Sequence, residues 1–126
     1  MWYNKGVVLD DLGRKDEALE AYKKALEIDS KYTKAWSNKG VVLSALGRKD
    51  EALEACEKAL EIDSKYTEAW YNKACAYSLM NKKNEALADL KHAIELDPNN
   101  RELAKRDKDF KKLWEERDFK DIVYSQ

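Results

Sequence analysis

The chain has 126 residues, an ordinary size for one domain, and 39% of them are charged. Its 24 basic and 25 acidic side chains nearly cancel, and the formal charge of −1 excludes the strongly basic surface that is typical of nucleic-acid-binding proteins. No apolar run approaches the roughly 18 residues that a membrane span needs, and no signal sequence is recognisable at the N-terminus. We therefore expect a cytoplasmic protein with neither nucleic-acid nor membrane partners.

The chain contains one sequence three times. Nearly identical segments begin at Trp2 and Trp36, and a looser copy begins at Trp70. These tryptophans are 34 residues apart, and a fixed period of roughly 20–50 residues is typical of stacked-repeat proteins. Such a unit buries its apolar face only against its neighbours in the stack. The fold is therefore expected to be one structural unit repeated.

Each repeat is predicted to form two helices, which we call helix A and helix B. In the central repeat, helix A runs from about Thr33 to Leu46, and Gly47 then favours the left-handed conformation that ends a helix. Asp50 is predicted to cap helix B, which ends near Asp63. The other repeats carry the same two signals, at Gly13 and Asp16 and at Asn81 and Asn84.

Small residues recur where two helices of a repeat are expected to approach closely, and large side chains fill the space beside them. They stand at three fixed positions of the repeat: Gly6, Gly40 and Ala74; Ala18, Ala52 and Ala86; Ala25, Ala59 and Ala93. Cys56 takes the place of Tyr22 and Leu90, and we expect it and Cys75 to be core residues. Two isolated cysteines predict neither a disulfide nor a metal site, and no cofactor is expected.

The pattern of Trp36, Gly40, Leu43, Ala52, Cys56 and Ala59 resembles the tetratricopeptide repeat (TPR). Asp97-Pro98-Asn99-Asn100 also matches the closing turn of that family. The resemblance implies an all-α, right-handed α-solenoid of antiparallel helix pairs. It divides the chain into an N-terminally truncated repeat at 1–32, repeats at 33–66 and 67–100, and a C-terminal capping helix with a short tail at 101–126. The truncation suggests a fragment of a longer array or a first helix that frays.

Ser30 and Ser64 stand where the family has proline after helix B. Because proline is a hard stop for a helix, its loss allows helix B to continue into the next helix A. Such fused helices would let neighbouring chains exchange hairpins. An ordinary turn is the alternative.

The segment after Pro98 is predicted to form the capping helix. Asn99 or Asn100 is expected to cap it, and its apolar side would cover helix B of the third repeat through Leu103, Phe110, Leu113 and Trp114. A second apolar cluster follows from Phe119 to Tyr124. This cluster either folds back on the capping helix or is an exposed tail available to a partner.

The TPR resemblance implies that the A helices line a concave groove that binds peptides. The groove positions carried over to this chain are Tyr3, Asn4, Val7 and Asp11 in the first repeat, Lys34, Ser37, Asn38, Val41 and Ala45 in the second, and Glu68, Tyr71, Asn72, Cys75 and Leu79 in the third. Asp10, Ser44 and Ser78 are neighbouring groove positions. Tyr71 and Val41 are the anchors that we expect to contribute most.

One TPR subset grips the C-terminal carboxylates of chaperones through Lys and Asn. Here tyrosine, serine, valine and cysteine occupy the positions that such a clamp requires, so we do not expect one. An apolar strip of Val7, Val41 and Cys75 instead suits an amphipathic or hydrophobic segment. Asn4, Asn38 and Asn72 either contact that ligand or bond to backbone and neighbouring helices.

No set of residues predicts catalysis, because the only histidine, His92, is expected on the outer face of helix B without a partner base. The predicted function is therefore a protein-interaction scaffold that binds a peptide segment of a partner. The alternative is homo-oligomerisation, through the terminal helices or by hairpin exchange.

Overall fold

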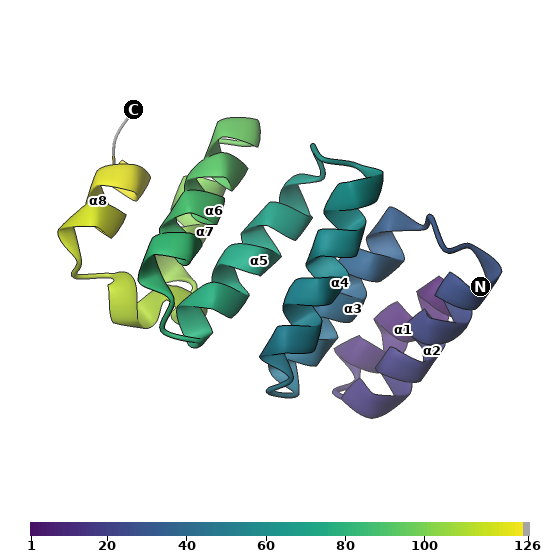
Figure 1. Ribbon diagram of the computed structural model, residues 1–126. Coiled ribbons are helices and arrows are strands. Elements are labelled where there is room, and N and C mark those ends of the chain that lie inside the picture. The colour runs from purple at the N-terminus through teal and green to yellow at the C-terminus, as the bar shows by residue number, and fades with distance from the viewer. Residues whose placement is uncertain (125–126) are drawn as a thin grey trace.

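The computed structural model describes residues 1–124, which form three consecutive helical hairpins and a C-terminal cap (Figure 1). The hairpins are α1 (Trp2–Asp11) with α2 (Lys15–Ile28), α3 (Thr33–Ala45) with α4 (Lys49–Ile62), and α5 (Thr67–Leu79) with α6 (Lys83–Leu96). The cap consists of α7 (Asn100–Arg106), the 3₁₀ helix η1 (Lys108–Leu113) and α8 (Arg117–Tyr124). Each hairpin packs against the next, which makes a right-handed α-solenoid and confirms the predicted fold class. No helix in this part of the chain is long and apolar enough to cross a membrane.

The turn inside each hairpin forms where the sequence predicted it. Gly13 and Gly47 have φ angles of 79° and 81°, and Asn81 has a φ of 63°, so each ends its helix in the left-handed region. The predicted cap of α4 is wrong by two residues, because Arg48 is the N-cap and Asp50 lies inside the first turn. The Arg48 guanidinium instead donates to Glu51 at 2.7 and 2.8 Å.

The absence of proline after helix B was expected to allow helix B to fuse with the next helix A. Turns instead separate these helices. Asp29 and Asp63 are extended, so α2 ends before α3 begins and α4 ends before α5 begins. The indole N–H of Trp36 donates to the carbonyl of Ser30 at 2.8 Å, and that of Trp70 donates to the carbonyl of Ser64 at the same distance. The ordinary turn is thus present, and the continuous helix proposed as the route to hairpin exchange is not.

The buried core confirms the predicted pairing of small and large residues. A Cβ atom on Gly6 would lie 2.5 Å from Cε1 of Tyr22, and one on Gly40 would lie 2.9 Å from Sγ of Cys56. Cys56 is buried, and this burial raises the pKa of its thiol to about 12. Helices α1 and α2, and α3 and α4, can therefore approach closely only because the glycines have no side chain.

A capping element follows the third repeat as predicted, but it is not one continuous helix, because its first helix stops at Arg106. The next residue, Asp107, is extended, and its side chain accepts a hydrogen bond from the backbone N–H of Asp109, which starts η1. Leu103, expected on the buried side, is 40% exposed, and Phe110 packs edge-on against Tyr71 of α5 with ring centroids 5.6 Å apart. The break thus turns the chain toward helix A of the third repeat.

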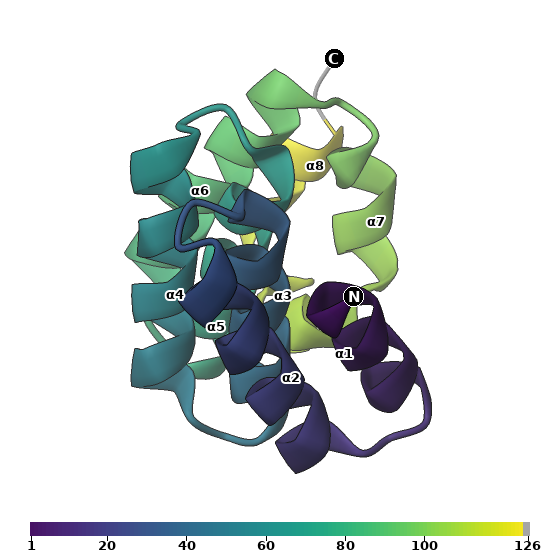
Figure 2. The same ribbon diagram turned by 90° about the vertical axis from the view of Figure 1, so that its right-hand side faces the viewer.

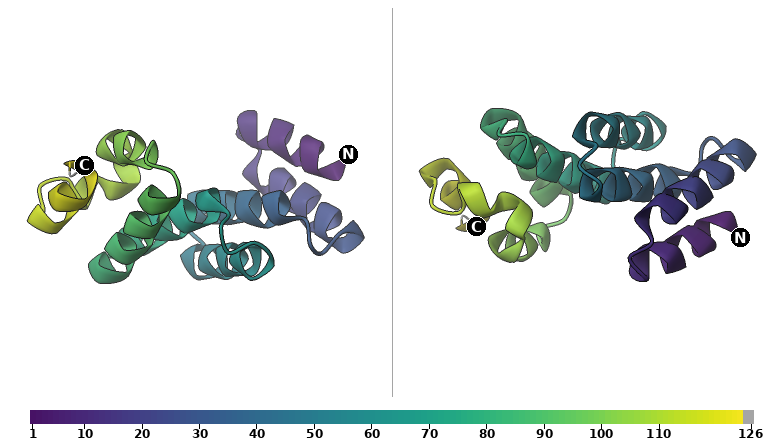
Figure 3. Two further views of the ribbon diagram at one scale, coloured as in Figure 1. Left: turned by 90° about the horizontal axis from the view of Figure 1, so that it is seen from above. Right: turned by 90° about the horizontal axis from the view of Figure 1, so that it is seen from below.

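After this break, α8 returns along the cap. Phe119 and Val123 are fully buried, which confirms that the second apolar cluster folds back on the chain, although Tyr124 stays 63% exposed. Figure 2 shows α7 and α8 beside the hairpins, and Figure 3 shows α1 and the cap at opposite ends, both on the same side of α3. Ser125 and Gln126, in the expected tail, lie outside the described residues.

Candidate peptide-binding groove

The most accessible part of the expected groove lies on α3. Val41 is 39% exposed, Ala45 is exposed, and Ser44 beside them is half-buried. Opposite α3, the side chains of α5 and two carboxylates of the cap close a hollow of about 300 Å³. Its lining residues are Gly40, Val41, Ser44, Ala45, Tyr71, Asn72, Cys75, Leu79, Asp107 and Asp109. This hollow joins the predicted groove positions to residues that the sequence did not single out.

Asparagines connect the A helices of successive repeats. The side-chain amide of Asn38 donates to the Tyr3 hydroxyl at 3.0 Å, and that of Asn72 donates to the Ser37 hydroxyl at 3.1 Å. Asn38 and Asn72 therefore bond to a neighbouring helix, which was the alternative to contact with the ligand. Asn4 is exposed. Ser37 is only 1% exposed, so its expected place on the accessible groove wall is corrected.

The third repeat contributes far less open surface than expected, because η1 lies on α5. Tyr71 and Cys75 are each 6% exposed and Ser78 is 4% exposed. The Ser78 hydroxyl donates to the backbone carbonyl of Asp109 at 2.7 Å, which fixes η1 against the helix. Tyr71 was expected to be a leading anchor, and this expectation is corrected because the chain's own cap covers most of its ring.

The other predicted groove residues keep contact with solvent. Those that are exposed are Asn4, Asp11, Lys34, Val41, Ala45 and Glu68, and those that are half-buried are Tyr3, Val7, Asn38, Asn72 and Leu79. Asp10 is half-buried and forms an ion pair with Lys15. The exposed groove positions thus lie on α1, α3 and the start of α5, and the hollow lies between α3, α5 and η1.

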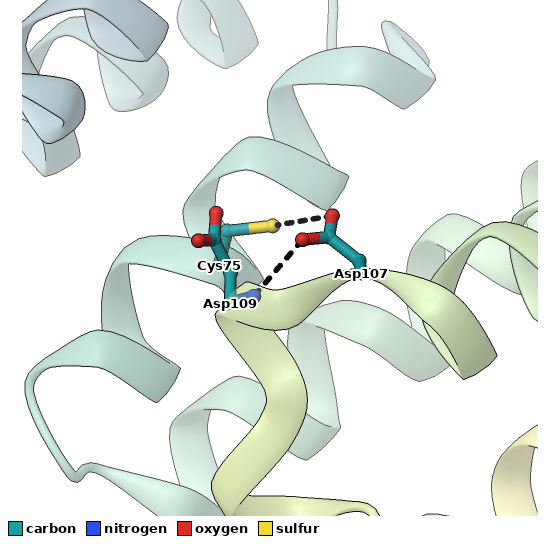
Figure 4. Close-up of side chains that lie close together, drawn as sticks. All are labelled: Cys75, Asp107 and Asp109. Carbon is teal, nitrogen blue, oxygen red and sulfur yellow. Dashed lines mark hydrogen bonds between the residues drawn. The ribbon is translucent and has the colours of Figure 1, made fainter.

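Asp107, Asp109 and Cys75 form a polar cluster at this end, shown in Figure 4. One ligand atom from each of the three lies within 4.8 Å of the others. The Asp107 carboxylate accepts hydrogen bonds from the Tyr71 hydroxyl at 2.8 Å and from the Asp109 backbone N–H at 3.0 Å, and the Cys75 thiol lies 3.8 Å from it. Asp107 therefore orients both α5 and η1.

The cluster is electrically unbalanced. Burial, together with the charge of Asp107, raises the pKa of the Asp109 carboxyl above its ordinary value. Burial raises the pKa of the Tyr71 hydroxyl and, with both carboxylates nearby, that of the Cys75 thiol. Within residues 1–124, no lysine or arginine forms an ion pair with either carboxylate, as judged by distances up to 4.0 Å. Neither carboxylate is therefore directly paired with a basic side chain of the described residues.

Sequence reasoning missed Asp107 and Asp109 because both were placed within one continuous helix. The available signal was an aspartate followed at the third position by Phe110, a pattern that begins a new helix and sends its apolar residue inward. His92 lies on the exposed face of α6, as expected, where its ring stacks on Trp70 with centroids 4.1 Å apart.

A sequence comparison matches the tetratricopeptide repeat to residues 1–32, 33–66 and 67–100. The chain belongs to the tetratricopeptide repeat family. This confirms three TPR units in succession, and the helices after residue 100 form an additional cap. The comparison with curated proteins gave no match. TPR units form scaffolds for protein interaction, which is the general function that the family match and the solved structures support.

Solved TPR structures share this fold. The human RPAP3 first TPR domain superposes with a TM-score of 0.80 at 26% identity, over 89% of this chain and 86% of that one. The first TPR of Spaghetti (RPAP3), bound to the HSP90 peptide SRMEEVD, gives 0.78 at 22% identity, over 98% and 91%. YrrB, described as a TPR protein with an unusual peptide-binding site, gives 0.73 at 31% identity, over 78% of this chain but only 50% of YrrB.

Proposed function

We propose that this TPR protein binds a peptide segment of another protein along α1 and α3, in the groove that ends at η1. The observation that carries the proposal is the hollow of about 300 Å³ beside Val41, a valine that is 39% exposed on the wall of a helical scaffold. Pockets of this kind, apolar with a few polar groups, are the usual sites of ligand binding. Two similar TPR structures support it. That of Spaghetti (RPAP3) holds an HSP90 peptide, and YrrB is described as having an unusual peptide-binding site.

The groove favours an extended or amphipathic segment with apolar side chains. Val7, Val41 and Leu79 supply accessible apolar surface, and the half-buried Tyr3 adds part of an aromatic side chain. Burial of an apolar side chain against such a strip contributes about 25 cal/mol per Å² removed from water. Val41 is therefore the residue whose replacement should weaken binding most.

Selection of ligands from a displayed library of random 12-residue peptides tests the proposal. Peptides enriched on the wild type should lose at least about tenfold in affinity for Val41→Glu, since a charge would face their apolar side chains. The melting temperature should stay the same, because a substitution at an exposed site changes stability by about 0.5 kcal/mol or less.

Ile62→Glu is the matched control, because Ile62 is also 39% exposed but lies at the end of α4, outside the groove. Binding to this variant should equal that of the wild type. Enriched peptides that bind Val41→Glu as well as the wild type would contradict the proposal, as would a library that yields no specific binder.

The N-terminal edge of the stack favours a second candidate, self-association. Val8 is 56% exposed, although the corresponding residues of the next repeats, Val42 and Ala76, are completely buried. Leu12 and Ile28 are also exposed, at 63% and 74%. A second copy of the chain would cover this apolar edge and form a homodimer. Analytical ultracentrifugation of the wild type and Val8→Lys tests it, and a wild type that stays monomeric over a wide concentration range excludes it.

We also propose a cytoplasmic location without nucleic-acid partners. The balanced charge of −1 and the two free, buried cysteines support it. Imaging of a tagged chain in the source cell tests the location. Retention on a nucleic-acid column at physiological salt would count against the proposed absence of nucleic-acid partners.

A further inference from the structure

The hollow at the end of the groove has an apolar side and an acidic side. Val41 and Ala45 of α3 and Leu79 of α5 supply carbon surface, whereas Asp107 and Asp109 supply carboxylates at the other side. Asp107 accepts hydrogen bonds from Tyr71 and from the start of η1, and its carboxylate is therefore held in place. The Asp107 carboxylate is thus held in position by the fold, in a hollow that apolar residues also line.

The electrostatic surroundings reinforce this polarity. Two more groove carboxylates, Asp11 and Glu68, are exposed, and Lys34 is the only basic residue among the predicted groove positions. Asp109 lies next to a like charge, and burial further disfavours its ionised form. A cation brought by a ligand would relieve both effects, because an opposite charge close by favours the carboxylate.

A lysine or arginine side chain has the shape that the hollow requires. Its aliphatic stem can lie along an apolar surface while its charged head reaches polar groups at the end. Hydrogen bonds between such a head and a carboxylate are about twice as strong as those between neutral groups. An acidic ligand side chain would face only repulsion here, since the hollow is lined by no basic residue.

We propose that the partner segment carries a lysine or arginine whose side chain passes between α3 and α5 and pairs with Asp109 and Asp107. This proposal rests on the proposed peptide-binding function and names its ligand as a cationic, amphipathic segment. The apolar strip would then hold the segment, and the two carboxylates would select its charge and its register along the groove.

The test is a second selection from the same 12-residue library, run in parallel on the wild type, Asp109→Asn and Asp121→Asn. Asp109→Asn keeps the volume of the side chain and removes one charge from the hollow. Asp121→Asn removes an equal charge from the exposed face of α8, outside the groove, and controls for long-range attraction. Asp107 is left unchanged because it holds η1 in place.

Peptides that are enriched on the wild type and lose affinity for Val41→Glu should contain a lysine or arginine at one fixed position. Replacing that residue by norleucine should cost about tenfold in affinity on the wild type, and much less on Asp109→Asn. Asp121→Asn should bind like the wild type in 150 mM salt, where the Debye length is about 8 Å.

The remaining outcomes separate the two proposals. Groove-binding peptides without a conserved cation, or with conserved acidic residues, would overturn this inference and leave the proposed function in place. Absence of any binder that depends on Val41 would overturn both. Titration with Zn²⁺ and Ca²⁺ by calorimetry completes the test, because tight binding of either ion that is lost in Asp109→Asn would assign the carboxylates to a metal and refute the peptide's cation as their partner.

Discussion

Gly6 of α1 lies directly against the ring of Tyr22 of α2, so closely that a Cβ atom at Gly6 would be 2.5 Å from Cε1 of the tyrosine. Gly6→Ala should therefore destabilise the fold. Overpacking typically costs roughly 1–3 kcal/mol, and it outweighs the gain of about 1 kcal/mol in helix propensity when glycine becomes alanine. Chemical denaturation should show a net loss of up to about 2 kcal/mol.

The third repeat supplies the control for this prediction, because it has Ala74 and Leu90 at the two corresponding positions, both fully buried. In the Tyr22→Leu background, Gly6→Ala should no longer destabilise, since the smaller side chain leaves room for the methyl group. A double-mutant cycle measures the coupling. Equal effects of Gly6→Ala in both backgrounds would show that the contact with Tyr22 does not determine the cost.

Tyr71→Phe removes the hydroxyl that donates to Asp107 at 2.8 Å. The partly buried carboxylate then loses a donor, which typically costs about 1–3 kcal/mol, and η1 is held less firmly on α5. We expect faster hydrogen exchange in residues 107–113 and a lower melting temperature.

Tyr77→Phe is the control, because the described residues offer no hydrogen-bond partner to the Tyr77 hydroxyl. Its melting temperature and exchange rates should be those of the wild type. If both variants exchange equally fast in residues 107–113, the bond between Tyr71 and Asp107 does not hold the cap.

The sequence predicted the repeats well because each unit is determined by local signals. Gly13, Gly47 and Asn81 end their helices through backbone preferences that need no knowledge of the fold. The groove was predicted less well because exposure depends on which segment covers a surface. The family pattern gave Tyr71 and Cys75 as groove positions on α5, but nothing within a repeat shows that η1 returns to cover them.

The difference between local signals and contacts with distant segments also explains the errors at the cap. Apolar residues spaced for one long helix also fit three short ones, and the hydrogen bond from Tyr71 to Asp107, 36 positions apart, supports the break in addition to the local cap. Such a contact between distant positions is invisible to a helical pattern. The hollow with Asp109 could therefore be found only after the cap had been placed.

Asp109→Asn should show a pH-dependent gain in stability. The pKa of this carboxyl is raised above its ordinary value of 3.8, so the folded state binds the proton more tightly than the unfolded state. The wild type therefore loses stability as the pH rises through the window between 3.8 and the raised pKa, whereas asparagine does not titrate.

The gain should be about 1 kcal/mol or less at pH 7, because the group is only partly buried, and it should vanish below the ordinary pKa. Thermal unfolding at pH 7 and pH 3.5 measures it. A gain that is equal at both pH values would mean that charge is not its cause.

Asp89→Ala should stabilise the third hairpin. Asp89 is 9% exposed, one of its carboxylate oxygens has no hydrogen-bond partner, and its pKa is raised by burial despite Lys73, whose Nζ lies 3.9 Å away. The other repeats have the buried Ala21 and Ala55 at this position, and Lys39 of the second repeat lies over a tryptophan ring at 5.0 Å without such an acid. Lys73 keeps its own place over Trp70 at 5.3 Å, so the loss of a long ion pair should be outweighed by the removal of a poorly solvated charge. We expect a gain of roughly 0.5–2 kcal/mol in the free energy of unfolding at pH 7, of the size common for consensus substitutions.

Lys73→Met in the wild type is the complementary measurement: it should destabilise, because it leaves Asp89 without any cation, and it should have a smaller effect once Asp89 is alanine. A lower stability of Asp89→Ala would show instead that the pair with Lys73 is a net contribution to the fold.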